Sequence, residues 1–501
     1  MSLATLSLMC SAPVANADLL PLHVDHVDSP TIRDSAGRQV LLRGVNVNGL
    51  LDYAQLKPRL PATVPLRRRD FRRMAALGFD LVRIPVNWSR LEPQRGTFNR
   101  TYVAHIRERV HWAAAQGIYA VVDLHQDAWT KYLATPDGEV CPRRSRPSQG
   151  WDGAPLWATL SDGLSTCMVR DSRNSPAVER AFTSFWHDRD GIQSELLGTW
   201  RQLANALAGE RAIAGWDVFN EPNSGDLDPA GEPALLGAFY RSAIAAIREG
   251  ESAAQGGFKH VVFFEPSSRW PGNSPQSHVP PPGFTQDPNV VYAPHLYAGS
   301  LGDTDGPRWR GAINSEFQDA AAESQLYRAP LVTGEYGWFG LPHRRRIAYF
   351  SRKIDARLWG AAWWQWNNAC GNPNAFRNGR DRRPTRIVGN LYRYSCPDQR
   401  PLSPLPTTRR ILERPYPRAA PGRLTLLRSH PDAARFLIEG VAPSPPSGNC
   451  RLVIWIPARG KRHPFVRGVG ASDLSIRRVR GGWLANACVT GQYRLHGGYP
   501  G

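Results

Sequence analysis

The chain has 501 residues, 42% of them hydrophobic and 21% charged, so it is long enough for one large and one small domain and is not wholly disordered. No run of about 18 apolar residues occurs, so the sequence predicts no membrane-spanning helix. The formal charge of +19 favours a polyanion partner, but only five of the 62 Lys and Arg residues are lysine and the arginines are scattered. We therefore expect no nucleic-acid partner, and only weak attraction to anionic lipid surfaces.

The first residues have the pattern of an export signal. Leu3 to Met9 forms a short apolar core, and Ala15 and Ala17, just before Asp18, have the small-x-small spacing of a signal-peptidase site. The sequence therefore predicts a signal peptide over residues 1–17 and a secreted, extracellular protein.

Short apolar runs alternate with amphipathic segments between residues 38 and 370. Eight such units predict a (β/α)8 TIM barrel, within a catalytic domain over residues 18–412. A doubly wound sheet would need a glycine fingerprint after its first strand, and the sequence has none. The predicted strands are Gln39–Val47, Phe79–Pro85, Ile118–Asp123, Ala214–Phe219, His260–Phe264, Val290–Pro294, Ala329–Gly334 and Gly360–Trp366. The predicted helices include Arg67–Leu77, Tyr102–Gln116, Gln193–Ala208, Pro233–Gly250 and Ser315–Tyr327, the last with Ser315 as its N-cap.

Two regions depart from this alternation. The connection from Ala128 to Ile192 is far longer than is usual between a strand and its helix, and it is rich in aromatic residues, which favours a functional lid. After Leu412, short alternating runs such as Arg423–Leu427 and Arg451–Ile456 are separated by Gly and Pro. They predict a small β-sandwich domain over residues 413–501.

Six cysteines follow the predicted signal peptide, and none has the C-x-x-C spacing of a metal site. An even number behind an export signal is typical of disulfides formed in an oxidising compartment. The simplest arrangement joins neighbours in the sequence, so that each bond lies within one predicted loop or domain. The predicted disulfides are Cys141–Cys167, Cys370–Cys396 and Cys450–Cys488.

Barrel enzymes carry their chemistry at the carboxyl ends of the strands. Here Asn220-Glu221-Pro222 follows the fourth predicted strand, and Glu335 follows the seventh. A charge at the end of an apolar strand is costly unless it is used or paired. Two carboxylates that face one barrel mouth are the minimum apparatus for glycoside hydrolysis, one as acid/base and one as nucleophile. A structural salt bridge from one of them to Arg83 is the alternative.

These strand ends resemble those of glycoside hydrolase family 5. The resemblance covers residues 28–412 and rests on Arg83, His125, Asn220-Glu221-Pro222, His295-x-Tyr297, Glu335 and a tryptophan in the eighth strand. Within the family, Asp-Leu-His-Gln-Asp at 123–127, Gly-Ala-Pro-Leu-Trp at 153–157 and Gly-Glu-Tyr-Gly at 334–337 resemble the endoglycoceramidases. The terminal β-sandwich is also similar to that subgroup.

The resemblance implies the catalytic roles. Glu221 would be the acid/base and Glu335 the nucleophile. Asn220 would hold the sugar 2-hydroxyl, in a hydrogen bond that strengthens in the transition state. Tyr297 would bond Glu335, and His295 would support Glu221.

It also implies the groups around the sugar. Arg83 would lower the pKa of the nucleophile by its positive charge. His125 and Asp127 would bind hydroxyls in the −1 subsite, and Trp364 or Trp366 would form its hydrophobic floor. Strand alternation would place both tryptophans on one face, so the sequence does not separate them.

The expected protein is therefore a secreted, monomeric, retaining β-glycosidase that cleaves between the glycan and the ceramide of glycosphingolipids, without a metal or organic cofactor. The aromatic residues of the long connection, Trp270 and the segment Trp338–Leu341 are interpreted as an apolar track for the lipid. A family 5 cellulase or other β-glucanase, a steryl glucosidase and an enzyme for galactosylceramide-type lipids stay open. A carbohydrate- or lipid-surface-binding protein without catalysis would need one glutamate to be absent, and both are present.

Overall fold

A computed structural model describes residues 19–55, 57, 59–169, 175–228, 230–271, 278–300, 306–338, 344–375, 390–396, 398–445 and 449–500. The signal peptide predicted over residues 1–17 lies outside these residues. Within them, no helix has both the length and the apolar character needed to cross a bilayer.

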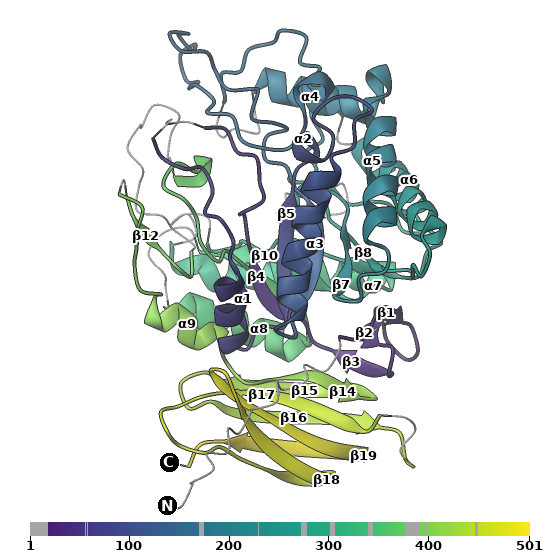
Figure 1. Cartoon of the computed structure of the whole chain (residues 1–501), viewed down its shortest axis with the longest axis vertical. Coiled ribbons are helices and arrows are strands. Elements are labelled where there is room, and N and C mark those ends of the chain that lie inside the picture. Colours follow the sequence, from purple (N-terminus) through teal and green to yellow (C-terminus); the bar gives the residue numbers. More distant parts are fainter. Residues whose placement is uncertain are drawn as a thin grey trace, which may run out of the picture.

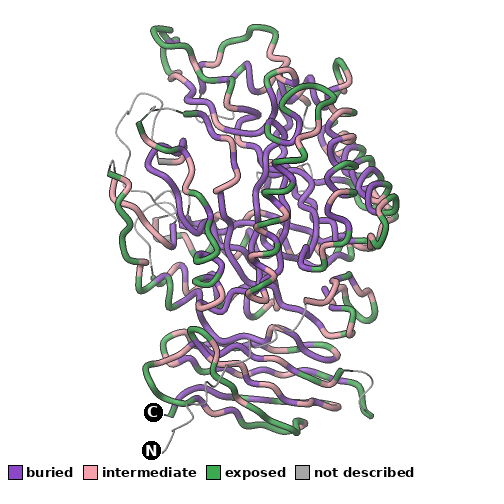
Figure 2. Tube along the Cα trace, viewed as in Figure 1, coloured by how far each residue is buried: buried purple, intermediate pink, exposed green. Residues whose placement is uncertain are grey.

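The centre of the molecule is a barrel of eight parallel strands, as predicted (Figure 1). Its order is β10-β11-β4-β5-β6-β7-β8-β9, and a bridge between Tyr292 and Leu331 brings the two end strands together. Every barrel-strand residue is buried, as parallel strands covered by helices require (Figure 2). The strands are β4 (Arg43–Asn46), β5 (Leu81–Val86), β6 (Tyr119–Leu124), β7 (Ile213–Asp217), β8 (Val261–Phe264), β9 (Val290–Tyr292), β10 (Val332–Gly337) and β11 (Gly360–Trp364).

Helices surround this barrel close to their predicted positions, with one clear exception. The helix predicted over Ser315–Tyr327 begins six residues earlier, at Trp309, because Ile313 extends the buried face that Phe317 and Ala320 continue. Ser315 therefore lies inside the helix and is not its cap. The described helices are α1 (Arg68–Ala76), α2 (Trp88–Leu91), α3 (Arg100–Ala114), α4 (Pro176–Trp186), α5 (Ile192–Leu207), α6 (Glu232–Ala253), α7 (Trp309–Tyr327), α8 (Arg344–Arg357) and α9 (Pro406–Leu412).

The first predicted strand, Gln39–Val47, is two strands in two sheets. Its beginning is β3 (Arg38–Val40), which pairs with β14 (Tyr416–Pro421) of the C-terminal region, and its end is β4 of the barrel. The division falls at Leu41 and Leu42, which are buried in two different cores. An apolar run buried throughout gives no sign in the sequence of where one sheet ends and the next begins.

The C-terminal strands form one antiparallel nine-stranded sheet around their own hydrophobic core. Three N-terminal strands belong to this sheet, so it contains residues from both ends of the described chain. Its strands are β1 (Leu22–Asp25), β2 (Thr31–Asp34), β3, β14, β15 (Arg423–His430), β16 (Arg435–Ala442), β17 (Arg451–Pro457), β18 (Phe465–Val479) and β19 (Gly482–Gly498).

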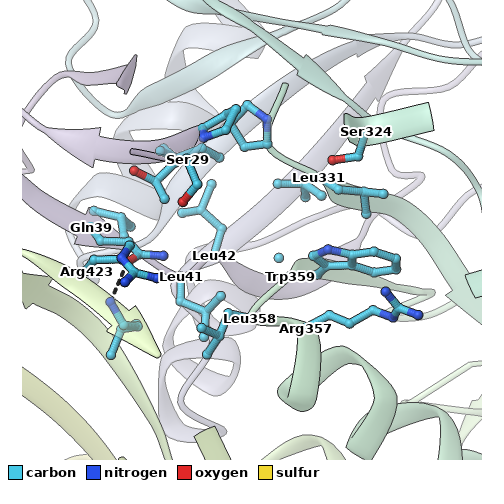
Figure 3. Close-up of a pocket in the computed structure, with 18 of the residues that line it drawn as sticks. Ser29, Gln39, Leu41, Leu42, Ser324, Leu331, Arg357, Leu358, Trp359 and Arg423 are labelled. Atoms are coloured by element: carbon cyan, nitrogen blue, oxygen red, sulfur yellow. Dashed lines mark hydrogen bonds between the residues drawn. The ribbon is translucent and has the colours of Figure 1, made fainter. Parts of the chain in front are cut away.

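This sheet covers the amino-terminal ends of the barrel strands. Tyr416 Oη donates a hydrogen bond to the carbonyl oxygen of Gly78, just before β5, at 2.7 Å. The indole of Trp455 lies so close to Gly78 that an added Cβ would be 2.1 Å from its Nε1, which requires glycine there. A cavity of about 310 Å³ lies at the same junction, between Gln39, Leu331 and Trp359 (Figure 3). The sheet is therefore at the opposite end of the barrel from the carboxyl ends of the strands (Figure 1). The cavity is at the same end as the sheet, because residues that precede β4, β10 and β11 line it.

Candidate active site

Arg83 is the centre of the charged cluster at the carboxyl ends of the strands. It lies in β5, is 1% exposed, and contacts carboxylates contributed by four other segments. The contacts are Nε to Asp217 Oδ2 at 2.8 Å, Nη1 to Glu335 Oε1 at 2.8 Å, Nη2 to Asp123 Oδ1 at 2.9 Å and Nη2 to Glu265 Oε1 at 3.0 Å. Burial opposes the charge of Arg83, but these carboxylates outweigh it and raise its pKa well above the usual value. The guanidinium is thus a fixed positive charge in a dry site.

The two predicted catalytic glutamates face each other beside this guanidinium. Glu335, in β10, is 5% exposed, and its Oε2 accepts a hydrogen bond from Tyr297 Oη at 2.8 Å. Glu221 follows β7 and lies with its Oε1 2.9 Å from His295 Nδ1. One carboxylate oxygen of each glutamate and a ring nitrogen of His295 all lie within 4.8 Å of one another. The structure therefore brings Tyr297 to Glu335 and His295 to Glu221, as the family resemblance implies.

The pKa of Glu335 is raised to about 7. Burial is the largest cause, and it outweighs the opposing charges of His295 and Arg83. The expected lowering by Arg83 is therefore present but smaller than the effect of burial, so the net direction is the reverse of the one inferred from the sequence.

This pKa gives a pH prediction. A neutral carboxyl group cannot attack the anomeric carbon, so kcat/KM should fall about tenfold per pH unit as the pH drops below about 7. Initial rates on an aryl β-glycoside between pH 4 and about pH 8 measure this limb. A rate that stays constant down to about pH 5 would contradict it, because Glu335 would then be ionised throughout.

The predicted −1 subsite lies beside the glutamates. His125 Nδ1 is 2.8 Å from Asp123 Oδ2, and its Nε2 is 3.9 Å from Asp127. Trp364, the last residue of β11, stacks parallel to the His125 ring, with a centroid distance of 5.6 Å. Trp366 is fully buried against Tyr392. The expected common face is therefore wrong, because regular alternation ends with the strand at Trp364, and it is Trp364 that lies with the residues predicted to bind the sugar.

Glu265 is a site residue that the sequence reasoning missed. It directly follows β8, is 1% exposed, and its Oε2 accepts a hydrogen bond from the main-chain N–H of Glu221 at 2.8 Å. A glutamate directly after an apolar strand is the pattern that identifies Glu221 and Glu335. Glu265 follows the fifth predicted strand in the same way, so the sequence carries the same signal for it.

The main chain of Glu221 is held on both sides. Its φ of 37° is in the left-handed region, which costs a non-glycine residue on the order of 1–3 kcal/mol. Glu265 accepts from its N–H, and Gln126 Nε2 donates to its carbonyl oxygen at 3.1 Å and to that of Asn220 at 2.8 Å. These buried side chains therefore offset the strain and fix the direction of the Glu221 side chain.

Among the residues that the structure describes, three groups have the proximity of metal ligands. They are His125 with Asp127 and Asp152, Glu221 with His295 and Glu335, and Asp123 with Asp217 and Glu265. In the last group the Arg83 guanidinium contacts all three carboxylates, so the protein itself supplies their countercharge. Glu335 of the second group is bound to the same guanidinium. The expectation of a reaction without metal or cofactor stays a prediction.

The long connection between β6 and α5 packs its large aromatic residues inward. Trp129 contacts both Phe182 and Phe185 in the barrel core, and Trp270 and Trp338 are also buried there. The interpretation as a lipid track is therefore wrong for these buried residues, whereas Trp151 and Trp157 are half-buried. Phe339 lies outside the described residues. Five large apolar side chains of the same connection are exposed instead, namely Tyr132, Val140, Leu156, Leu164 and Val169.

The structure contains the three predicted disulfides, Cys141–Cys167, Cys370–Cys396 and Cys450–Cys488. The first lies within the long connection, the second follows β11, and the third joins the start of β17 to β19.

A parallel (β/α)8 barrel with two glutamates at opposed strand ends, and an arginine, a tyrosine and histidines around them, is the arrangement of a glycoside hydrolase. The family model for cellulase, glycosyl hydrolase family 5, matches residues 34–370, and the chain belongs to this family. It is an enzyme of the glycoside hydrolase class.

Among solved structures, the chain is similar to an endogalactoceramidase, with 41% identity, a TM-score of 0.84 and coverage of 95% of this chain and 99% of that one. Endo-glycoceramidase II from Rhodococcus sp., in its ganglioside GM3 complex, has the same fold at 23% identity and a TM-score of 0.73, over 94% of this chain and 99% of that one. Endoglycoceramidase I of Rhodococcus hoagii (strain 103S) is 26% identical over 283 residues, which are 55% of this chain and 53% of that protein. The chain thus matches about half the length of this curated relative.

Proposed function

We propose that the protein is a secreted, monomeric, retaining endo-β-glycosidase that releases the intact glycan of a glycosphingolipid from its ceramide. The observation that carries the proposal is the approach of the two carboxylates, with oxygens of Glu221 and Glu335 within 4.8 Å. A nucleophile must reach the anomeric carbon with no water between, which needs carboxyl groups about 5–5.5 Å apart rather than the 6.5–9.5 Å of inverting enzymes.

The residues divide the reaction into two steps. In the first, the Glu335 carboxylate attacks the anomeric carbon while Glu221 gives its proton to the glycosidic oxygen, so that the ceramide alcohol leaves and a glycosyl ester forms on Glu335. In the second, the Glu221 carboxylate takes a proton from a water molecule that attacks the same carbon and displaces Glu335. Arg83 and Tyr297 donate hydrogen bonds to Glu335 and can therefore stabilise the negative charge that its carboxylate regains when the ester is cleaved.

The ceramide side of the proposal is supported by the relatives and by exposed apolar residues of the long connection. The relatives at 41% and 26% identity are an endogalactoceramidase and an endoglycoceramidase. The long connection, which continues from β6 and the −1 subsite, exposes five large apolar side chains between Tyr132 and Val169. Exposed apolar groups suit contact with the lipid surface in which a ceramide is embedded. We propose galactose-linked ceramide as the preferred substrate, because the endogalactoceramidase is the more similar of the two.

Product analysis tests this function. Purified protein should release ceramide and the whole oligosaccharide from glycosylceramides, with faster release from galactosylceramide-type glycans than from lactosylceramide, and should leave carboxymethylcellulose intact. Proton NMR of the early products should show the β-anomer of the sugar first, because two displacements restore the configuration. The Glu335→Ala protein is the control. The α-anomer first would contradict retention, and hydrolysis of carboxymethylcellulose alone would identify a β-glucanase.

A further inference from the structure

We infer that Glu265 is a positioning residue that fixes the acid/base Glu221 for proton transfer to the leaving group. The inference rests on the proposed function, in which Glu221 is the proton donor. Glu265 touches Glu221 by two routes, one through the main chain and one through His295, and each route is visible in the contacts of its buried carboxylate.

The main-chain route is the hydrogen bond from the Glu221 N–H to Glu265 Oε2. Because Glu221 has a positive φ, its peptide groups point in directions that the neighbouring strands do not pair. Without Glu265 this buried N–H would lose its acceptor, and residue 221 would relax toward the usual negative φ. The Glu221 carboxylate would then leave the glycosidic oxygen, since its Cα–Cβ direction depends on that backbone angle.

The side-chain route passes through an imidazole. His295 Nδ1 is 2.9 Å from Glu221 Oε1, and on the other side of the ring His295 Nε2 is 3.2 Å from Glu265 Oε1. Glu265 thus forms an ion-pair contact with the back of the ring, while the front of the ring is hydrogen-bonded to the Glu221 carboxylate. The nucleophile depends less on this arrangement, because Glu335 is bound directly by Arg83 and Tyr297, whereas His295 Nδ1 lies 3.6 Å from it.

Glu265 is itself rigid. Tyr240 Oη accepts from the Glu265 N–H at 3.0 Å and donates to the Glu265 carbonyl oxygen at 2.9 Å. Its Oε1 is anchored to Arg83 Nη2 at 3.0 Å. A carboxylate held at both its main chain and its side chain transmits a fixed geometry to the group it contacts, which is what precise placement of a catalytic acid requires.

The test separates loss of acid catalysis from general damage. Glu265→Gln keeps the reach but not the charge, and Glu265→Asp keeps the charge but not the reach. Each variant is assayed by kcat/KM on aryl β-glycosides with good and poor leaving groups. We expect a loss of about 10–100-fold with a poor leaving group and little loss with dinitrophenol, since a good leaving group needs little protonation. Thermal unfolding of each variant checks that it is folded, and Glu265→Asp serves alone if Glu265→Gln does not fold.

Asp123→Asn is the matched control, because it removes a carboxylate that lies 2.9 Å from the same Arg83 nitrogen and whose other oxygen contacts His125. It should lose rate equally on both substrates. If each Glu265 variant lost rate equally on the good and the poor leaving group, the inference would be overturned, and Glu265 would be a structural partner of Arg83. The proposed function is tested separately by the wild type and by Glu221→Ala. If the wild type is inactive on every glycoside, or if Glu221→Ala shows no dependence on the leaving group, the proposed function fails instead.

Discussion

Glu335→Ala should lower kcat on the order of 10⁶-fold on every substrate, because no glycosyl ester can form without the carboxylate that attacks the anomeric carbon. Glu221→Ala should lose about 10²–10⁴-fold on glycolipids but retain the first step on dinitrophenyl glycosides. Azide is small enough to enter the space left by the side chain and needs no general base. Added azide should therefore restore turnover of Glu221→Ala and give a β-glycosyl azide.

The product of azide rescue distinguishes the two roles. In Glu221→Ala the azide attacks a glycosyl-enzyme, and two displacements give the β product. In Glu335→Ala it attacks the substrate itself, so one displacement gives the α product. Mass spectrometry and NMR of the azide adducts measure both. A β-glycosyl azide from Glu335→Ala would mean that the assignment of nucleophile and acid/base is reversed.

Arg83→Met should both inactivate and destabilise the protein. Removing the guanidinium leaves the carboxylates of Asp123, Asp217, Glu265 and Glu335 buried together without their shared countercharge. Breaking a buried ion pair by removing one partner typically costs about 3–5 kcal/mol. Urea unfolding should show this loss at neutral pH, and the loss should shrink as the pH falls, because protonated carboxyl groups no longer need the positive charge.

Arg95→Met is the control for this substitution. Arg95 also contacts two carboxylates, those of Asp190 and Glu195, both at 3.0 Å, but its side chain is 41% exposed. Water solvates all three groups when the pair is broken, so the unfolding midpoint should not move. A destabilisation equal to that of Arg83→Met would mean that burial does not determine the cost.

Most of the fold and the centre of the site could be predicted because they leave local signals. A parallel barrel strand is apolar on both faces, and a charged residue at its end stands out against that background. A charged residue at the end of an apolar strand identifies Glu221 and Glu335, and the same pattern marks Glu265. Cysteine order was enough for the disulfides because each bond joins neighbours in the sequence.

The predictions that the structure contradicts concern features that depend on contacts between distant segments. The division of residues 39–47 between two sheets depends on β14, which is far along the chain. The inward packing of Trp129 and Trp338 depends on partners in the barrel core that composition does not specify. The net pKa of Glu335 depends on the balance between desolvation and two positive charges, and the sequence identifies only one of those charges with its direction.

The sheet shared by the two ends of the chain has a consequence for folding. Gln39 Oε1 accepts a hydrogen bond from Leu424, 385 residues away along the chain, and β3 lies between β2 and β14 in the sheet. During synthesis β3 therefore emerges from the ribosome long before its partner strand, and one of its edges waits unpaired. Contacts between such distant segments form slowly, and an unpaired strand edge is a template for association. We expect a chain stopped near residue 412 to aggregate even though it contains the whole barrel. Folding of the enzyme is therefore complete only when the C-terminal strands pair with β3.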